Sequence, residues 1–129
     1  MVDVDEAELR RIFLAAAREL NAGRYFEAHE AIEERLDDVP EAWWPLFLGL
    51  IQVAVGYHKL ASGTAGAARM LGIGLDKLEA FPDDALGMDV GALRRRAALD
   101  RERIDGRDLV AAEAALAIDP PRLLPVPSH

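Results

Sequence analysis

Apolar side chains recur every three or four residues along most of the chain, which is the spacing of one face of an α-helix. No segment shows the strict alternation of apolar and polar residues that is typical of a half-buried strand. The first helical set of apolar positions is Leu9, Ile12, Phe13, Ala16 and Leu20. Asp3 and Glu6 have the spacing of a capping box ahead of it, and Gly23 suits the left-handed position after it. The pattern predicts an all-α fold.

Two further helices are expected on either side of Pro40. Residues 24–37 carry one apolar face, whereas residues 41–61 are apolar nearly all round. Pro45 is tolerated in the second of these helices because it falls near the first turn, where its missing N–H costs no hydrogen bond. A helix without a polar face belongs in the middle of a bundle. We therefore expect residues 41–61 to be central, with residues 24–37 packed antiparallel to them because the connection is short.

A fourth helix is expected after the break at Ser62-Gly63-Thr64, with Thr64 as its cap. It contains Gly66, Gly72 and Gly74, each of which weakens a helix by up to about 1 kcal/mol relative to alanine. Close approach of a neighbouring helix would explain their presence, because a glycine has no side chain to keep two backbones apart. The glycines therefore predict that this helix packs tightly against another one.

The rest of the chain predicts one more helix and an extended end. Residues 89–104 form the fifth expected helix, and residues 109–118 are alanine-rich without a clear helical period. The chain after them is rich in proline, which favours an extended or mobile segment. The sequence thus predicts a compact bundle of about five helices over residues 1–118 and a tail over residues 119–129.

The composition limits the classes of function. The 129 residues include 23 acidic and 15 basic side chains, for a net charge of −8; this argues against a nucleic-acid partner, whose phosphates require a basic surface. The absence of cysteine excludes disulfides and thiolate metal sites. The longest uncharged run, residues 42–58, is shorter than the roughly 18–20 residues of a membrane span. The acidic start is unlike a signal peptide. We expect an acidic, cytoplasmic, single-domain protein with no membrane contact.

The antiparallel pair of helices predicts a polar cluster. If Leu36 lies near Pro45, then His29 lies near Gln52, whose amide must be hydrogen-bonded when it is buried. His29 and Glu33 are one helical turn apart and are the obvious partners. We therefore predict a cluster of these three side chains in the bundle core. The two expected additions to it are Glu30 and His58.

Two interpretations of this cluster are open. Histidine and carboxylate side chains at this spacing can hold a divalent metal or act as a general acid and base. They can equally form a buried hydrogen-bond network that fixes the register of two helices. The chain lacks the Glu-x-x-His pairs of di-metal bundles, and His29-Glu30-x-x-Glu33 lacks the second histidine of a zinc protease. The sequence therefore specifies neither a catalytic residue, nor a metal, nor a cofactor.

A second charged segment, in the fifth helix, favours a simpler interpretation. Arg94-Arg95-Arg96, Arg101 and Arg103 would form an anion-binding patch if they stood alone. Asp100 and Glu102 are interspersed among them, so the pattern is typical of a solvated helix face.

Two motifs of the chain occur in a characteristic order. They are Tyr25-Phe-Glu-Ala-His-Glu-Ala-Ile-Glu33 and Phe47-Leu-Gly-Leu-Ile-Gln-Val-Ala54, followed by His58 and Gly66-Ala67. With them the chain resembles the domain-of-unknown-function family numbered 309 over about residues 20–80. The resemblance implies a small all-helical bundle and brings no established activity. The characteristic residues of that family fall here on Glu27, His29, Glu30, Glu33, Gly49, Gln52 and His58.

These observations lead to two hypotheses of function. The first is a non-enzymatic binding or interaction module that uses the groove beside the cluster, with a small molecule or a protein as partner. The second is a small hydrolase or metal-dependent enzyme that uses His29, Glu30 and Glu33. A homodimer that buries leftover apolar surface is compatible with both hypotheses.

Overall fold

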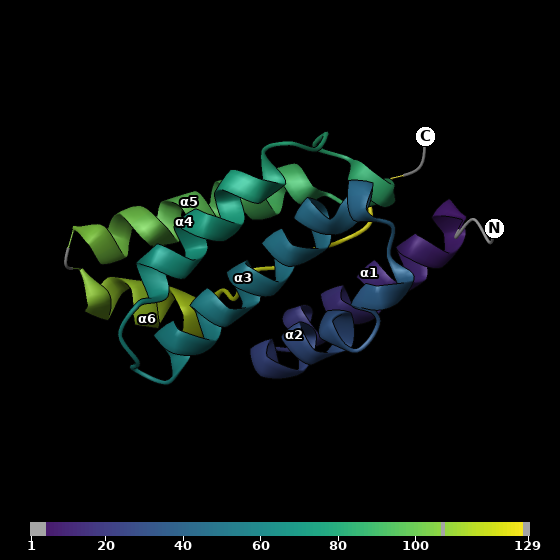
Figure 1. Ribbon diagram of the computed structural model, residues 1–129. Helices are drawn as coiled ribbons and strands as arrows, with labels where there is room; N and C mark the ends of the chain where they lie inside the picture. Colours follow the sequence, from purple (N-terminus) through teal and green to yellow (C-terminus); the bar gives the residue numbers. More distant parts are fainter. Residues whose placement is uncertain (1–4, 107, 128–129) are drawn as a thin grey trace.

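The computed structural model describes residues 5–106 and 108–127 and confirms the all-α class (Figure 1). Within these residues there are six α-helices and three short 3-10 turns, and no strand apart from an isolated bridge between Met88 and Pro125. The helices are α1 (Glu6–Asn21), α2 (Tyr25–Glu33), α3 (Trp44–Ala61), α4 (Ala67–Leu78), α5 (Val90–Asp105) and α6 (Leu109–Ile118). The 3-10 turns are η1 (Leu36–Asp38), η2 (Glu41–Trp43) and η3 (Ala85–Gly87). The alanine-rich segment is therefore a sixth helix, where the sequence predicted about five.

Helix α3 is central, as its apolar sequence predicted. It packs against α2 on one side and, most extensively, against α4 on the other (Figure 1). Gly49 on α3 and Gly74 on α4 lie at the closest approach, where a Cβ atom built on Gly74 would stand 2.8 Å from the carbonyl oxygen of Gly49. This contact confirms the close approach that the glycines of the fourth helix predicted.

Helix ends differ from the predictions in three places. The cap of α1 is Asp5, whose Oδ1 accepts the backbone N–H of Glu8 at 2.8 Å; the predicted cap, Asp3, lies outside the described residues. Helix α2 ends at Glu33, about one turn earlier than predicted, because the chain changes to the 3-10 turn η1. Thr64 does not cap α4; the position before α4 is Gly66, with a φ of +99° that glycine adopts without strain.

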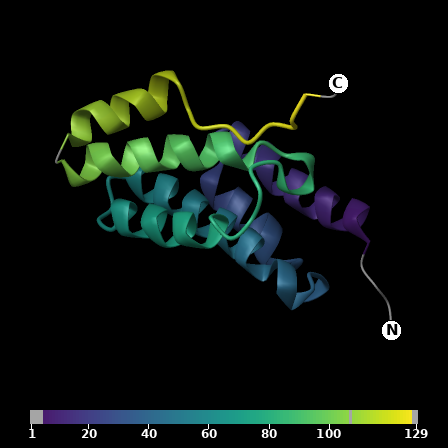
Figure 2. The same ribbon diagram turned by 90° about the horizontal axis from the view of Figure 1, so that it is seen from above.

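Helix α6 is the outermost element and the least tightly packed. It lies along α5 in the view from above (Figure 2), and its contacts with α3 and α5 are few. Residues 119–127 then run as extended chain back toward α1. The side chain of Asn21 holds this segment with two hydrogen bonds to the backbone of Leu123, at 2.7 and 2.9 Å. The tail is therefore attached to the bundle rather than free.

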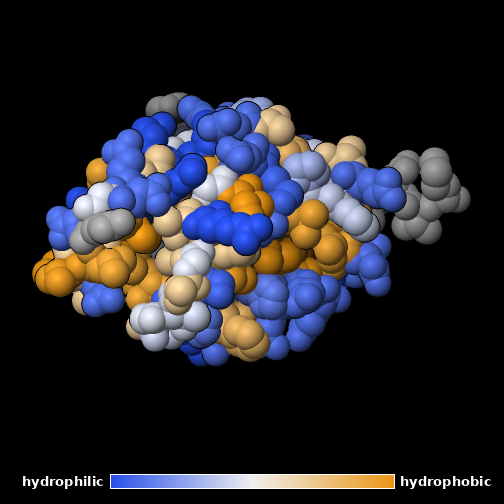
Figure 3. Space-filling view, turned by 60° about the vertical axis from the view of Figure 1, so that its left-hand side comes forward, coloured by the Kyte–Doolittle hydropathy of each residue, from blue (hydrophilic) through white to orange (hydrophobic). Residues whose placement is uncertain are grey.

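Several large apolar side chains remain exposed, and apolar areas interrupt the polar surface on the face shown in Figure 3. They are Phe26, Leu99, Leu109, Val110, Ile118 and Leu124. Three of the six are on α6, which carries little charge. No helix in the described part of the chain is long and apolar enough to cross a membrane.

Candidate functional site

His29 and His58 both pack against the ring of Phe26, at the surface of the α2–α3 pair. Phe26 lies between them, with its ring centroid 5.7 Å from that of His29 and 5.8 Å from that of His58. A cavity of about 300 Å³ opens here. We call it the imidazole groove and define it by Phe26, His29, Val55, His58, Lys59 and Thr64. Phe26 lies in the first turn of α2 and His58 lies near the end of α3. The contact between their rings therefore also shows that the two helices run antiparallel.

His29 forms one of the predicted contacts. Its Nε2 atom lies 3.0 Å from Oε2 of Glu33, one turn further along α2. The two groups carry opposite charges only when the imidazole is protonated. The Nδ1 atom of His29 is shielded from solvent and has no hydrogen-bond partner within the described residues. His29 therefore presents no nitrogen to the groove that is both accessible to solvent and without a partner.

Gln52 is not part of this cluster. Its Oε1 atom accepts a hydrogen bond of 2.8 Å from Nζ of Lys77 on α4. The physical reason is that Gln52 shares a face of α3 with Gly49 and Gly56, and both glycines contact α4. The prediction that this face is in tight contact with another helix is correct, but the partner helix is α4 rather than α2.

The carboxylates of the cluster are also not in the core. Glu27 and Glu30 are exposed, and the side chain of Glu33 is 63% exposed against 22% for His29. His58 is exposed as well. The expected inward orientation is wrong because α2 buries the opposite face, with Tyr25, Ala28 and Ile32, against the bundle. The polar motif residues of α2 therefore lie at the surface and do not form a buried network.

A buried polar centre does exist, on α5, and the sequence interpretation missed it. Asp100 is 1% exposed and accepts three hydrogen bonds: from the hydroxyl of Tyr57 at 2.6 Å, from Nε of Arg96 at 2.9 Å and from Nη1 of Arg103 at 3.3 Å. We call Tyr57, Arg96, Asp100 and Arg103 the Asp100 network. The arginines of α5 were interpreted as a solvated face, and for these two residues that interpretation is wrong.

The Asp100 network joins three helices. Tyr57 comes from α3, and Arg96 also donates to the backbone oxygens of Ala115 and Asp119 at the end of α6. Burial raises the pKa of the Tyr57 hydroxyl, and the negative charge of Asp100 raises it further. Tyr57 therefore stays a neutral donor to the carboxylate. A signal for this burial was present in the sequence, since Asp100 shares a helical face with Leu93, Ala97 and Ile104.

The α2–α3 pair is also the part of the chain that relates it to other proteins. Residues 13–71 match the family described as domain of unknown function (DUF309). The chain is therefore similar to this family over that segment. The resemblance that the motifs predicted is thereby confirmed. Comparisons with curated proteins and with solved structures give no match.

The DUF309 segment contains α2, α3 and the whole imidazole groove, whereas Asp100 lies outside it. Across residues 5–106 and 108–127, no three His, Asp or Glu side chains come together as a metal site. What the groove offers is an exposed aromatic ring, two imidazoles and an acidic helix beside them. This chemistry suits recognition of another molecule.

Proposed function

We propose that this chain is an interaction module whose imidazole groove docks a basic segment of another protein by an apolar anchor side chain. The observation that carries the proposal is the position of Phe26. Its side chain is 49% exposed although it stands at the edge of a cavity and contacts two imidazole rings. Exposed aromatic residues beside a small pocket are the usual anchors of protein interfaces.

Charge indicates the kind of partner. Glu27, Glu30, Glu33 and Glu34 are all exposed on or directly after α2. Lys59 is the one lysine or arginine among the residues that line the groove. Complementary charge accelerates association and selects partners, so a segment that carries lysine or arginine beside its anchor is favoured over an acidic one.

The alternative of a hydrolase or metal-dependent enzyme has less support. A general base must present a nitrogen or oxygen to the substrate within hydrogen-bond reach. Nε2 of His29 contacts Glu33, and Nδ1 is shielded. Glu30 is exposed on the surface of α2, and a metal would find no third ligand beside His29 and Glu33 among the described residues.

A pair of peptide libraries tests the proposal. Each peptide holds one leucine or phenylalanine anchor, flanked by lysine and arginine in the first library and by glutamate in the second. We expect saturable binding, measured by fluorescence anisotropy, from members of the basic library only, and affinity that falls as salt is added. Phe26→Ala should weaken it at least about tenfold, as is typical of an interface anchor.

Leu99→Ala is the matched control, because Leu99 is 44% exposed on α5, a helix with no contact to the groove. It should leave peptide affinity unchanged. Equal loss of binding in both variants, or equal binding of both libraries, would contradict the proposal. Hydrolysis of a bound peptide that is lost in His29→Ala would favour the enzyme instead.

A further inference from the structure

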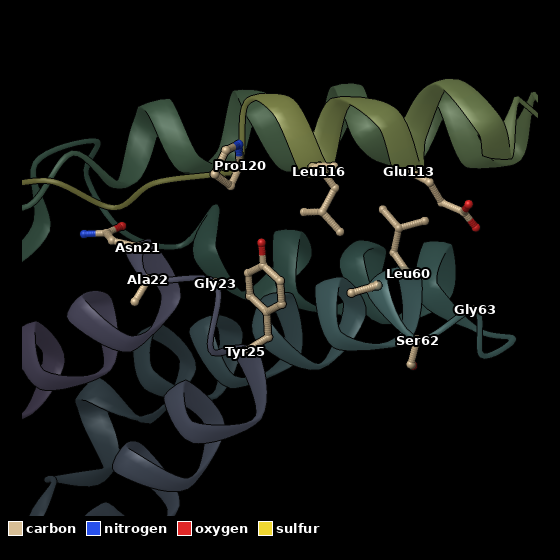
Figure 4. Close-up of a pocket in the computed structure, with 12 residues that line it drawn as sticks. Asn21, Ala22, Gly23, Tyr25, Leu60, Ser62, Gly63, Glu113, Leu116 and Pro120 are labelled. Atoms are coloured by element: carbon tan, nitrogen blue, oxygen red, sulfur yellow. The ribbon is translucent and has the colours of Figure 1, made fainter.

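A second, larger cavity lies on the other side of α2, beneath α6. It has a volume of about 640 Å³ and lies between the α1–α2 turn, the end of α3 and the inner face of α6 (Figure 4). We call it the tyrosine cavity; the residues that matter below are Asn21, Tyr25, Leu60, Glu113, Leu116 and Pro120. The volume is within the range of roughly 300–1,000 Å³ of ordinary small-molecule sites.

The hydroxyl of Tyr25 is the central polar group of this cavity. Figure 4 shows it directed toward α6, between Leu116 and Pro120. Only 6% of Tyr25 is exposed, and its ring packs on that of Tyr57 at a centroid distance of 5.7 Å. Within the described residues the hydroxyl makes no hydrogen bond. It is not among the side-chain atoms that are shielded from solvent, so it is open to the cavity and available to a molecule there.

The structure also fixes the orientation of Tyr25. Its neighbour Tyr57 is held by the carboxylate of Asp100, and Arg96 connects the same carboxylate to the end of α6. Tyr57, against which the Tyr25 ring packs, and the end of α6 therefore belong to one hydrogen-bonded unit. A donor that is positioned in this way needs little reordering when a ligand arrives, which favours affinity.

The lining specifies the charge of the ligand. Leu60 and Leu116 extend toward each other and provide apolar walls, and Glu113 stands at one side of them (Figure 4). No lysine, arginine or histidine lines the cavity among the described residues. An anion would meet the carboxylate of Glu113 without a compensating cation, whereas an ammonium group would be attracted to it.

We infer that the tyrosine cavity is a binding site for a small, mainly apolar ligand that is neutral or cationic and accepts or donates a hydrogen bond at Tyr25. This site is separate from the imidazole groove: of the residues that line the two cavities, none is shared. Its occupant is a small molecule rather than a protein segment.

Three probes of the same shape test the charge preference: benzylamine, benzyl alcohol and benzoate. Binding is followed by NMR, from the shifts of the Tyr25 ring signals, assigned with Tyr25→Phe. We expect saturable shifts with benzylamine and benzyl alcohol, and an affinity for benzoate at least tenfold below that for benzylamine. Tyr25→Phe should lower the affinity for benzyl alcohol about three- to tenfold, which is the effect of one hydrogen bond.

A pair of tryptophan variants on α6 controls for location. Ala117 is exposed and lines the cavity, whereas Ala114 is exposed and does not line it. Ala117→Trp should therefore abolish benzylamine binding and Ala114→Trp should retain it, with backbone amide spectra showing that both variants are folded. Benzoate binding equal to benzylamine binding, or benzylamine binding that persists in Ala117→Trp, would overturn the inference.

Discussion

Two acid–base side-chain pairs of this molecule have the same spacing and opposite surroundings. His29 and Glu33 on α2 are four residues apart, as are Arg96 and Asp100 on α5, and their closest atoms are 3.0 and 2.9 Å apart. Yet the carboxylate of Glu33 is 63% exposed and that of Asp100 is 1% exposed. The spacing alone thus predicts that a pair forms, and the packing around it decides what the pair does.

The difference comes from what covers each helix face. Three neighbours surround Asp100, because Tyr57 reaches it from α3 and both Arg96 and Arg103 donate to it. Among residues 5–106 and 108–127, no helix covers the outward face of α2, and the side chain of Glu33 stays 63% exposed to water. A buried carboxylate with its full set of donors stabilises a unique arrangement of helices, whereas an exposed one remains free to meet a partner. We therefore assign structure to the Asp100 network and recognition to the imidazole groove.

The largest effect should follow removal of the buried carboxylate. Asp100→Ala leaves two arginines and the Tyr57 hydroxyl without their acceptor. Breaking a buried pair in this way costs about 3–5 kcal/mol of unfolding free energy, which urea denaturation would measure. Arg96 would also lose its fixed position at the end of α6, so amide hydrogen exchange in α6 should accelerate.

The control for this prediction is Asp105→Ala on the same helix. Asp105 is exposed and lies 3.6 Å from Arg101, so its removal should change the unfolding free energy by less than about 0.5 kcal/mol. If Asp100→Ala had an equally small effect, the contrast between the buried Arg96–Asp100 pair and the exposed His29–Glu33 pair would lose its basis.

Much of the fold followed from apolar periodicity. The all-α class and the central position of residues 44–61 were predictable because a helix that is apolar all round must be surrounded. The alanine-rich α6 was left open, since Ala112 and Leu116 are its only buried residues and provide almost no period. The early end of α2 depends on the 3-10 turn η1, which no local signal separates from a further helical turn.

Only part of the arrangement of the candidate residues was predictable: the contact between His29 and Glu33 is present, whereas Gln52 lies elsewhere. Glu27 and Glu30 on α2 share its outward surface with Phe26. Gln52 on α3 was expected to face α2. The side of α3 that it shares with Gly49 and Gly56 packs against α4 instead. Which of two neighbours a helix face meets depends on rotation about the helix axis. For a helix that is apolar on every side, the sequence does not specify that rotation.

The second-largest effect should appear at alkaline pH. The pKa of Tyr57 is raised by burial and by Asp100 from its ordinary value of 10.0, so the folded protein keeps a proton that the unfolded chain loses. This contribution to stability is complete below about pH 10 and falls as the pH rises further, by up to about 1.4 kcal/mol per unit. Urea denaturation at pH 8 to 11 would show the decline.

Tyr57→Phe separates this contribution from other alkaline effects. It removes one hydrogen bond to a carboxylate, so it should lower the unfolding free energy by about 1.5–3 kcal/mol near neutral pH. It should also make the decline above pH 10 shallower, because one titrating group is gone. An equally steep decline in wild type and variant would show that Tyr57 does not keep its proton in the fold.

The smallest effect should follow a change in the exposed pair. Glu33→Gln keeps the shape of the side chain and removes its charge, and because Glu33 is mostly in water the unfolding free energy should change by less than about 0.5 kcal/mol. The same variant should weaken the binding of basic peptides in the anisotropy measurement, since it removes one of the exposed carboxylates of α2. A variant that binds less and unfolds as before is the signature of a recognition surface. Substantial destabilisation by Glu33→Gln would instead place the His29 pair in the same structural class as the Asp100 network.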